Sequence, residues 1–121
     1  MRRDAPSSEP EVAVLIRAID SGGEIYSTGI ILQELLQGFS KPKAHDLIIE
    51  RFASIPMLVP DTSDYISAAN LQNRCRRKGV QASTIDALIA QLSLRFNLSL
   101  LTTDNDFKHM SKVVKLKFPK Q

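Results

Sequence analysis

Apolar residues recur along the chain with two different spacings, and each spacing predicts a different kind of element. Helical spacing, together with residues that favour helix ends, predicts helices at 11–19, 30–37, 41–53, 61–78 and 83–96, and a short one that begins at Asp104 or Asn105. Short apolar or alternating runs predict strands at 24–27, 56–59, 98–101 and 113–118. Strands and helices therefore alternate, which favours an α/β fold with a mostly parallel sheet in one domain, 1–121.

Turn and cap residues place the boundaries of these elements. Ser21-Gly22-Gly23 is expected to end the first helix, and Gly79 ends the helix that Asp61 caps. The run Leu98 to Leu101 is apolar almost throughout, as expected for a strand that is buried on both faces. Val113 to Phe118 alternates and carries lysines, which is typical of an edge strand.

Composition narrows the class of protein. The chain has 121 residues, 43% of them hydrophobic, and a net charge of +3, so one soluble domain with a single core is expected and a nucleic-acid partner is allowed. With no Trp and few aromatic residues, a surface that binds nucleic acid mainly by base stacking is disfavoured. One cysteine cannot form an internal disulfide, and no segment resembles a signal peptide or a membrane span, so a cytoplasmic location is expected.

Three acids stand in apolar surroundings. Glu34 follows Ile30 and Ile31 at helical spacing, Asp86 shares a helix face with Ile89, and Asp104 follows a buried strand. A carboxylate on a partly buried face is costly unless it is paired or binds a metal. Because sites in open α/β sheets form beyond the carboxyl ends of strands, these acids are candidates for one site.

Two more residues lie at the same predicted edge of the sheet. Asp106 is two positions beyond Asp104, and Thr102 supplies a hydroxyl directly after the strand. A set of oxygen donors without Cys or His suits Mg²⁺ or Mn²⁺, which serve phosphate chemistry by activating water. Such a set predicts a metal site built from carboxylates.

Simpler interpretations of each acid remain open. Glu34 faces solvent if the predicted helix is rotated, and Asp86 is favoured near a helix N-terminus by the helix dipole alone. Asp104 is a good helix cap, and Asp106 fits the first turn of the following helix without any chemical role.

The motifs that carry these acids resemble those of a known family. I-Y-S-T-G-I-I-L-Q-E-L-L-Q-G, S-T-I-D-A-L-I-A and L-L-T-T-D-N-D-F are similar to the acidic motifs of PIN-domain ribonucleases, in particular the VapC-type toxins of type II toxin–antitoxin systems. The similarity runs from about Glu24 to Phe118. It implies a PIN-like three-layer α/β/α fold and a metal-dependent endoribonuclease that cleaves structured or transfer RNA with a metal-activated water.

The same resemblance implies roles for residues and partners. Glu34, Asp86 and Asp104 would be catalytic acids that hold Mg²⁺ or Mn²⁺, with Asp106 as an accessory metal ligand and Thr102 as an accessory hydroxyl. A small antitoxin would neutralise the enzyme, and the enzyme would be a homodimer.

A basic run offers a further contact surface. Arg74, Arg76, Arg77 and Lys78 lie at the end of a predicted helix, where positive charge complements the helix dipole. The functional alternative is contact with RNA phosphates or with acidic residues of the antitoxin.

One part of the family pattern has no counterpart. PIN domains normally begin with an apolar central strand that ends in Asp, whereas this chain begins M-R-R-D-A-P-S-S-E-P. We therefore expect the central first strand to be missing, its two neighbours to have unpaired edges, and the chain to be poorly folded or inactive alone. The alternative function is a non-catalytic, truncated module that still binds antitoxin or RNA. A phosphoryl-transfer or receiver-like domain is disfavoured, because no conventional phosphate loop is present.

Overall fold

The computed structural model describes the backbone of residues 18–21 and all atoms of residues 24–102 and 105–118. The N-terminal segment before residue 18 lies outside the described residues, so the predicted helix at 11–19 can be judged only at its end. That end is wrong, because Ala18 and Ile19 lie in a strand.

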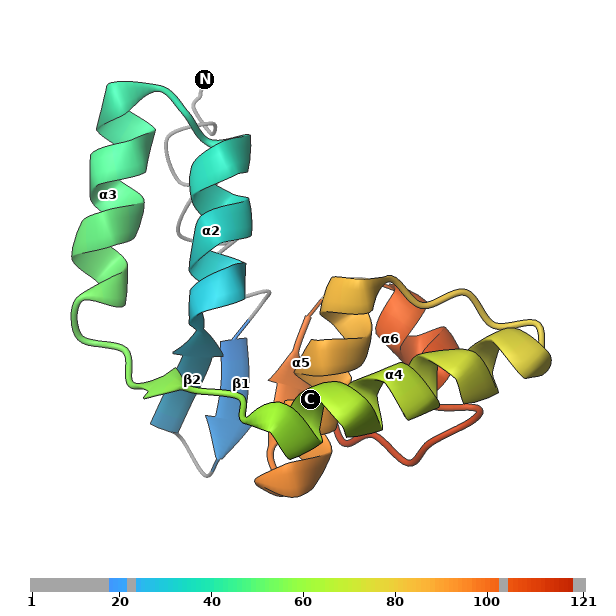
Figure 1. Ribbon diagram of the computed structural model, residues 1–121. Helices are drawn as coiled ribbons and strands as arrows, with labels where there is room; N and C mark the ends of the chain where they lie inside the picture. The colour runs from blue at the N-terminus through green and yellow to red at the C-terminus, as the bar shows by residue number, and fades with distance from the viewer. Residues whose placement is uncertain (1–17, 22–23, 103–104, 119–121) are drawn as a thin grey trace.

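A four-stranded sheet stands at the centre of the molecule (Figure 1). Its order is β3 (Met57–Leu58), β2 (Glu24–Thr28), β1 (Ala18–Ser21) and β4 (Ser99–Leu101). β2 pairs with β3 in parallel, and β1 is antiparallel to both β2 and β4. β2, β3 and β4 therefore point the same way, as the predicted α/β fold requires, and β1 is the strand that runs against them.

β1 and β2 form a hairpin that the apolar pattern did not predict. Ser21 pairs with Glu24, so only Gly22 and Gly23 separate the two strands. Two glycines between strands are typical of the two-residue hairpin turns that need positive φ angles. Ser21 therefore ends a strand and not a helix, while Gly22 and Gly23 lie outside the described residues.

The expected gap between β2 and β4 is filled. β1 pairs Ile19 with Tyr26 on one side and with Leu100 on the other, so both neighbouring strands have a partner on their inner edge. The prediction that these two edges would be unpaired is wrong. β1 fills this position but runs antiparallel to both neighbours, so the sheet is not continuously parallel.

The predicted last strand is reduced to one bridge. Within 113–118, Lys117 forms a parallel bridge with Ser99, and its carbonyl oxygen accepts a hydrogen bond of 2.9 Å from the Leu100 amide. Since β4 is only three residues long, it offers little edge for further pairing.

The predicted helices after β2 are confirmed, with small changes at their ends. They are α2 (Gly29–Gly38), α3 (Pro42–Phe52), α4 (Thr62–Arg77), α5 (Thr84–Arg95) and α6 (Asn105–Met110). Figure 1 shows α2 and α3 as a pair on one side of the strands, and α4, α5 and α6 as a group on the other.

One continuous core joins both helix groups to the sheet. Ile31 and Ile48 come from the α2–α3 pair, and Ala90, Leu100 and Phe107 come from α5, β4 and α6; all five are almost fully buried. Cys75 on α4 is also buried in this core, and burial raises the pKa of its thiol. Its setting is that of a core residue.

An ion pair of the buried Asp64 carboxylate with Arg95 joins α4 to α5. Asp64 is 1% exposed, and its side chain accepts hydrogen bonds from Arg95 and from the Asp61 amide. Arg95 also lies 3.4 Å from the Asp61 carboxylate and stacks over the ring of Phe96. Because Asp64 is in the first turn of α4 and Arg95 in the last turn of α5, the ion pair fixes two antiparallel helices at one end.

Interrupting β1 should loosen the whole sheet. We expect Ile19→Pro to destabilise the fold strongly, because proline removes a ladder hydrogen bond from a strand that is paired on both edges. Each orphaned group costs ~1–3 kcal/mol, so thermal unfolding by circular dichroism should shift down by roughly 10 °C. Ile19→Val keeps the amide and should melt close to the original; equal melting of the proline variant would exclude β1 from the sheet.

Asp61 should make stability depend on pH at the acid end. The hydroxyl of Ser63 donates to its carboxylate at 2.7 Å, and this bond, followed by the Asp64 amide, holds the pKa of Asp61 below its ordinary value of 3.8. The ionised form is therefore favoured by folding, so its stabilisation is complete above pH ~3.8 and is lost as the pH falls through the lower, folded value.

The matched variant is Asp61→Asn, which keeps a capping oxygen but cannot titrate. We expect the melting temperatures of the two proteins to differ near neutral pH and to converge below pH ~3.8. A difference that stays constant down to pH 2 would contradict a role for the Asp61 charge.

Candidate metal and nucleic-acid site

Asp86 is a buried acid at the start of α5. Its side chain is buried, with the residue 4% exposed, in agreement with its apolar neighbours in the sequence. Its amide donates a 3.0 Å hydrogen bond to the Ser83 hydroxyl, which caps the helix. Burial makes a carboxylate expensive unless other groups compensate its charge, so Asp86 is a candidate functional acid. Asp64 is buried as well, and Arg95 compensates its charge.

The loop before α5 is held in place from α4. The Val80 amide donates to the Cys75 carbonyl at 2.8 Å, and Gly79 takes the positive φ of 76° that reverses the chain. The Gln72 side chain then donates to the Ala82 carbonyl at 2.8 Å. These bonds fix Ser83, and through its hydroxyl they fix the first turn of α5, which carries Asp86.

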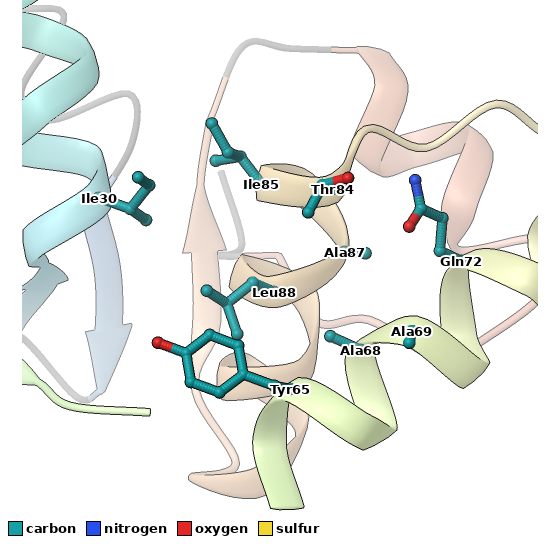
Figure 2. A pocket seen from close by; sticks show the side chains of 9 residues that line it. All are labelled: Ile30, Tyr65, Ala68, Ala69, Gln72, Thr84, Ile85, Ala87 and Leu88. Carbon is teal, nitrogen blue, oxygen red and sulfur yellow. The ribbon is translucent and has the colours of Figure 1, made fainter. Parts of the chain in front are cut away.

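An apolar groove lies between α2, α4 and α5. It has a volume of about 290 Å³, and Figure 2 shows Ile30 of α2 on one side, with Ile85 and Leu88 of α5 on the other. Tyr65 and Gln72 of α4 also line it. The groove brings the start of α2 opposite the start of α5.

Glu34 lies one turn beyond Ile30 on α2. Its side chain is partly buried, between full burial and the solvated position that the simpler interpretation assigned to it. The helix begins at Thr28, whose hydroxyl accepts from the Ile31 amide at 3.2 Å. Thr28 itself ends β2, so Glu34 is carried by the helix that leaves the carboxyl end of that strand.

The remaining candidates follow β4. Thr102 comes directly after the strand and is partly buried, while Asp104 lies outside the described residues. Asp106 is exposed in the first turn of α6. It borders a second, polar hollow of about 540 Å³, which we call the Arg76 hollow; its lining residues are Gln72, Arg76, Gln81, Ala82, Ser83 and Asp106.

A match to a protein-family model shows which family this chain belongs to. The model of the PIN domain matches residues 4–113. The chain belongs to the PIN domain family. No curated protein matches it. PIN domains are typically metal-dependent nucleases and generally use divalent metals, so a nucleic-acid substrate is indicated.

The donor atoms of this PIN domain suit Mg²⁺ or Mn²⁺, but the described residues alone do not complete a site. All candidate donors are carboxylate or hydroxyl oxygens, the ligands that these ions prefer. Within residues 24–102 and 105–118, no three acidic, His or Cys side chains gather closely enough to hold an ion. Glu34, Asp86 and Asp106 therefore do not form a three-ligand site without a further residue, such as Asp104.

β1 does not supply that further acid at the carboxyl edge. Its acidic residue, Asp20, pairs in register with Ile25 and Ser99, near the amino ends of β2 and β4. Because β1 runs against its neighbours, Asp20 stands toward the edge opposite Thr102. The central strand of this PIN domain therefore runs antiparallel to both neighbours and carries its acid toward the edge opposite Thr102.

The basic run divides between two faces of α4. Arg76 lines the polar hollow beside Ser83 and Asp106, whereas Arg74 and Arg77 line a separate depression with Gln91 and Leu94. Lys78 is exposed at the C-cap of the helix. Only Arg76 shares a surface with the candidate site.

Sequence reasoning missed two residues of the candidate site. Gln72 orders the loop before Asp86, and Gln81 lines the Arg76 hollow. Gln72 follows Ala68 by one helical turn, so its place on the inner face of α4 was readable from spacing. Gln81 carried no signal, because its position depends on how the loop turns.

Among the described helices, none is long and apolar enough to span a membrane.

The cap of α5 should matter for stability. We expect Ser83→Ala to lower the free energy of unfolding by about 1 kcal/mol, because it removes the oxygen that accepts the Asp86 amide. Ser83→Thr keeps a capping hydroxyl and should recover most of the loss. Urea unfolding followed by circular dichroism measures both, and equal midpoints for all three proteins would show that the cap is not formed.

Proposed function

We propose that this PIN domain is a Mg²⁺- or Mn²⁺-dependent endoribonuclease and acts as the toxin of a cytoplasmic toxin–antitoxin pair. The observation that carries the nuclease part is the buried Asp86, held at the start of α5 by a cap and an ordered loop, in a chain of this family. A carboxylate that is placed so firmly in apolar surroundings is suited to bind a cation.

The proposed ligands come from three elements of the chain. Glu34 on α2, Asp86 on α5 and Asp104 after β4 would hold the cation, with Asp106 as an accessory acid and the Thr102 hydroxyl nearby. When bound, the ion would supply the Lewis acidity that lowers the pKa of a water near a phosphodiester. Asp86 contributes a desolvated charge, and Ser83 and Gln72 keep it in place before the substrate arrives.

The toxin role is supported by sequence motifs and by surface character. The three acidic motifs resemble those of VapC-type toxins, whose antitoxins are small proteins and which form homodimers. Exposed apolar side chains such as Tyr65 and Ile66 lie on α4, and Tyr65 lines the apolar groove, so this surface suits a protein partner. We propose an antitoxin and a homodimer as the partners of this chain.

A non-catalytic module that binds RNA or antitoxin is the second candidate. It is favoured by the lack of a three-ligand cluster among residues 24–102 and 105–118, and by the reversed β1 with Asp20 away from the carboxyl edge. The two candidates differ in one measurable property, because only the nuclease must bind a divalent cation.

Mn²⁺ titration separates these two functions. For the nuclease, calorimetry should detect Mn²⁺ binding, and a labelled transfer RNA should be cleaved with Mn²⁺ and left intact with EDTA. Asp86→Asn should reduce both by ~10²-fold, because even outer-sphere partners of metal ligands change affinity by 10–100-fold. Asp46→Asn, an exposed acid on α3, is the control and should change neither.

The outcomes point to different conclusions. Loss of binding and cleavage in the Asp86 variant alone supports the nuclease, provided that circular dichroism shows a folded protein. Absence of Mn²⁺ binding in the unaltered chain, with RNA binding retained, would replace the nuclease with the non-catalytic module.

A further inference from the structure

The arginines of the basic run have different surroundings, although they are neighbours in sequence. A helix turns by 100° per residue, so Arg74 and Arg77 share one side of α4 and Arg76 lies well around from them. Arg76 lines the hollow that Ser83 and Asp106 also line. Arg74 and Arg77 line a different depression of about 310 Å³.

The Arg76 hollow is rich in hydrogen-bond donors. Arg76 is exposed, and among the described residues its guanidinium makes one long hydrogen bond, 3.3 Å to Asn73, so most of its five side-chain donors point to solvent. Gln81 is exposed beside it and adds an amide. The Ser83 oxygen accepts from the Asp86 amide, which leaves its own O–H to donate.

Volume and charge indicate what this hollow would bind. About 540 Å³ lies within the range of small-ligand sites, ~300–1,000 Å³, and can take a nucleotide unit. One guanidinium matches the single charge of a phosphodiester, and its planar fork suits two phosphate oxygens. Asp106 repels a phosphate, so the phosphodiester would lie beside Arg76. Asp106 would then lie on the side of the hollow that faces the proposed metal ligands.

The apolar groove provides a contrast on the other side of Gln72. That residue lines both cavities, but the groove is formed mainly by Ile, Leu and Ala side chains. A phosphate there would lose its hydration without gaining charged partners. The polar hollow is therefore the side of α4 on which a nucleic-acid strand would run.

We propose that the Arg76 hollow is a phosphate subsite for single-stranded RNA, beside Asp106 and the Ser83 cap that positions Asp86. The strand would pass between the C-terminal half of α4 and α6, with Arg76 and Gln81 on a phosphate adjacent to the one that is cleaved. Arg74 and Arg77 would not contact the same strand. This assignment rests on the proposed nuclease function, since that function makes RNA the occupant.

Salt-dependent binding tests the subsite without cleavage. A fluorescein-labelled, 12-nucleotide single-stranded RNA of mixed sequence is titrated in EDTA, and anisotropy is followed from 50 to 300 mM KCl. We expect Arg76→Ala to weaken binding several-fold at low salt and to reduce the slope of log K against log[salt] by ~0.7, the value for one phosphate contact on a single strand. Arg76→Lys keeps the charge and should retain the slope.

Arg77→Ala is the matched control, because it removes the same charge one residue away, about 100° around the helix, where it lines a different depression. We expect it to lower the slope by less than half as much as Arg76→Ala. An equal or larger loss with Arg77→Ala, no change with Arg76→Ala, or no RNA binding by the unaltered chain would each overturn the subsite.

The same protein also separates this inference from the nuclease proposal. Arg76-dependent RNA binding without Mn²⁺-dependent cleavage would refute the nuclease and keep the subsite. Cleavage that is unaffected by Arg76→Ala, together with an unchanged salt slope, would refute the subsite and keep the nuclease.

Discussion

Backbone pairing across the sheet depends on one strand of four residues. β1 lies between β2 and β4, and among the described strands it alone joins the part of the sheet that carries α2 to the part that leads to α6. Glu34 stands on the helix that follows β2, and Thr102 follows β4. The register of β1 therefore sets how these two residues are placed relative to each other. A shift by one residue would turn every β1 side chain to the other face of the sheet.

Local signals predicted most elements, and non-local pairing accounts for the errors. Asp61, Ser83 and Gly79 marked the ends of helices correctly, because caps act within a few residues. The β1–β2 hairpin was missed because Leu15, Ile16 and Ile19 have helical spacing, and this outweighed the turn signal of Gly22 and Gly23. Ile19 pairs with Tyr26 nearby and also with Leu100, and the second pairing is far away in the sequence and cannot be predicted from local spacing.

The candidate site was predicted in part for the same reason. The burial of Asp86 followed from its apolar neighbours, and that inference needed only the helical repeat. The helical repeat alone separates Arg76 from Arg74 and Arg77, but placing Arg76 beside Ser83 and Asp106 required the orientation of α4 against α5 and α6, which no short motif encodes. The pairing of Asp64 with Arg95 likewise depends on how two helices pack. That ion pair lies at one end of the α4–α5 pair and Asp86 at the other, so anchoring and candidate chemistry occupy opposite ends of the same helices.

The reversed β1 also has a consequence for how the chain folds. Its pairing with β2 joins strands that are close together in the sequence and is a local event, as is the packing of α4 on α5 through the short loop before Ser83. Its pairing with β4 joins Ala18 to Leu101, from opposite ends of the chain, and must close a far longer loop. We expect this contact to form late, since contacts between distant residues slow folding. Until it forms, the segments that carry Glu34 and Thr102 would move independently, so in a nascent chain these two residues would be placed relative to each other only after β4 had been synthesised.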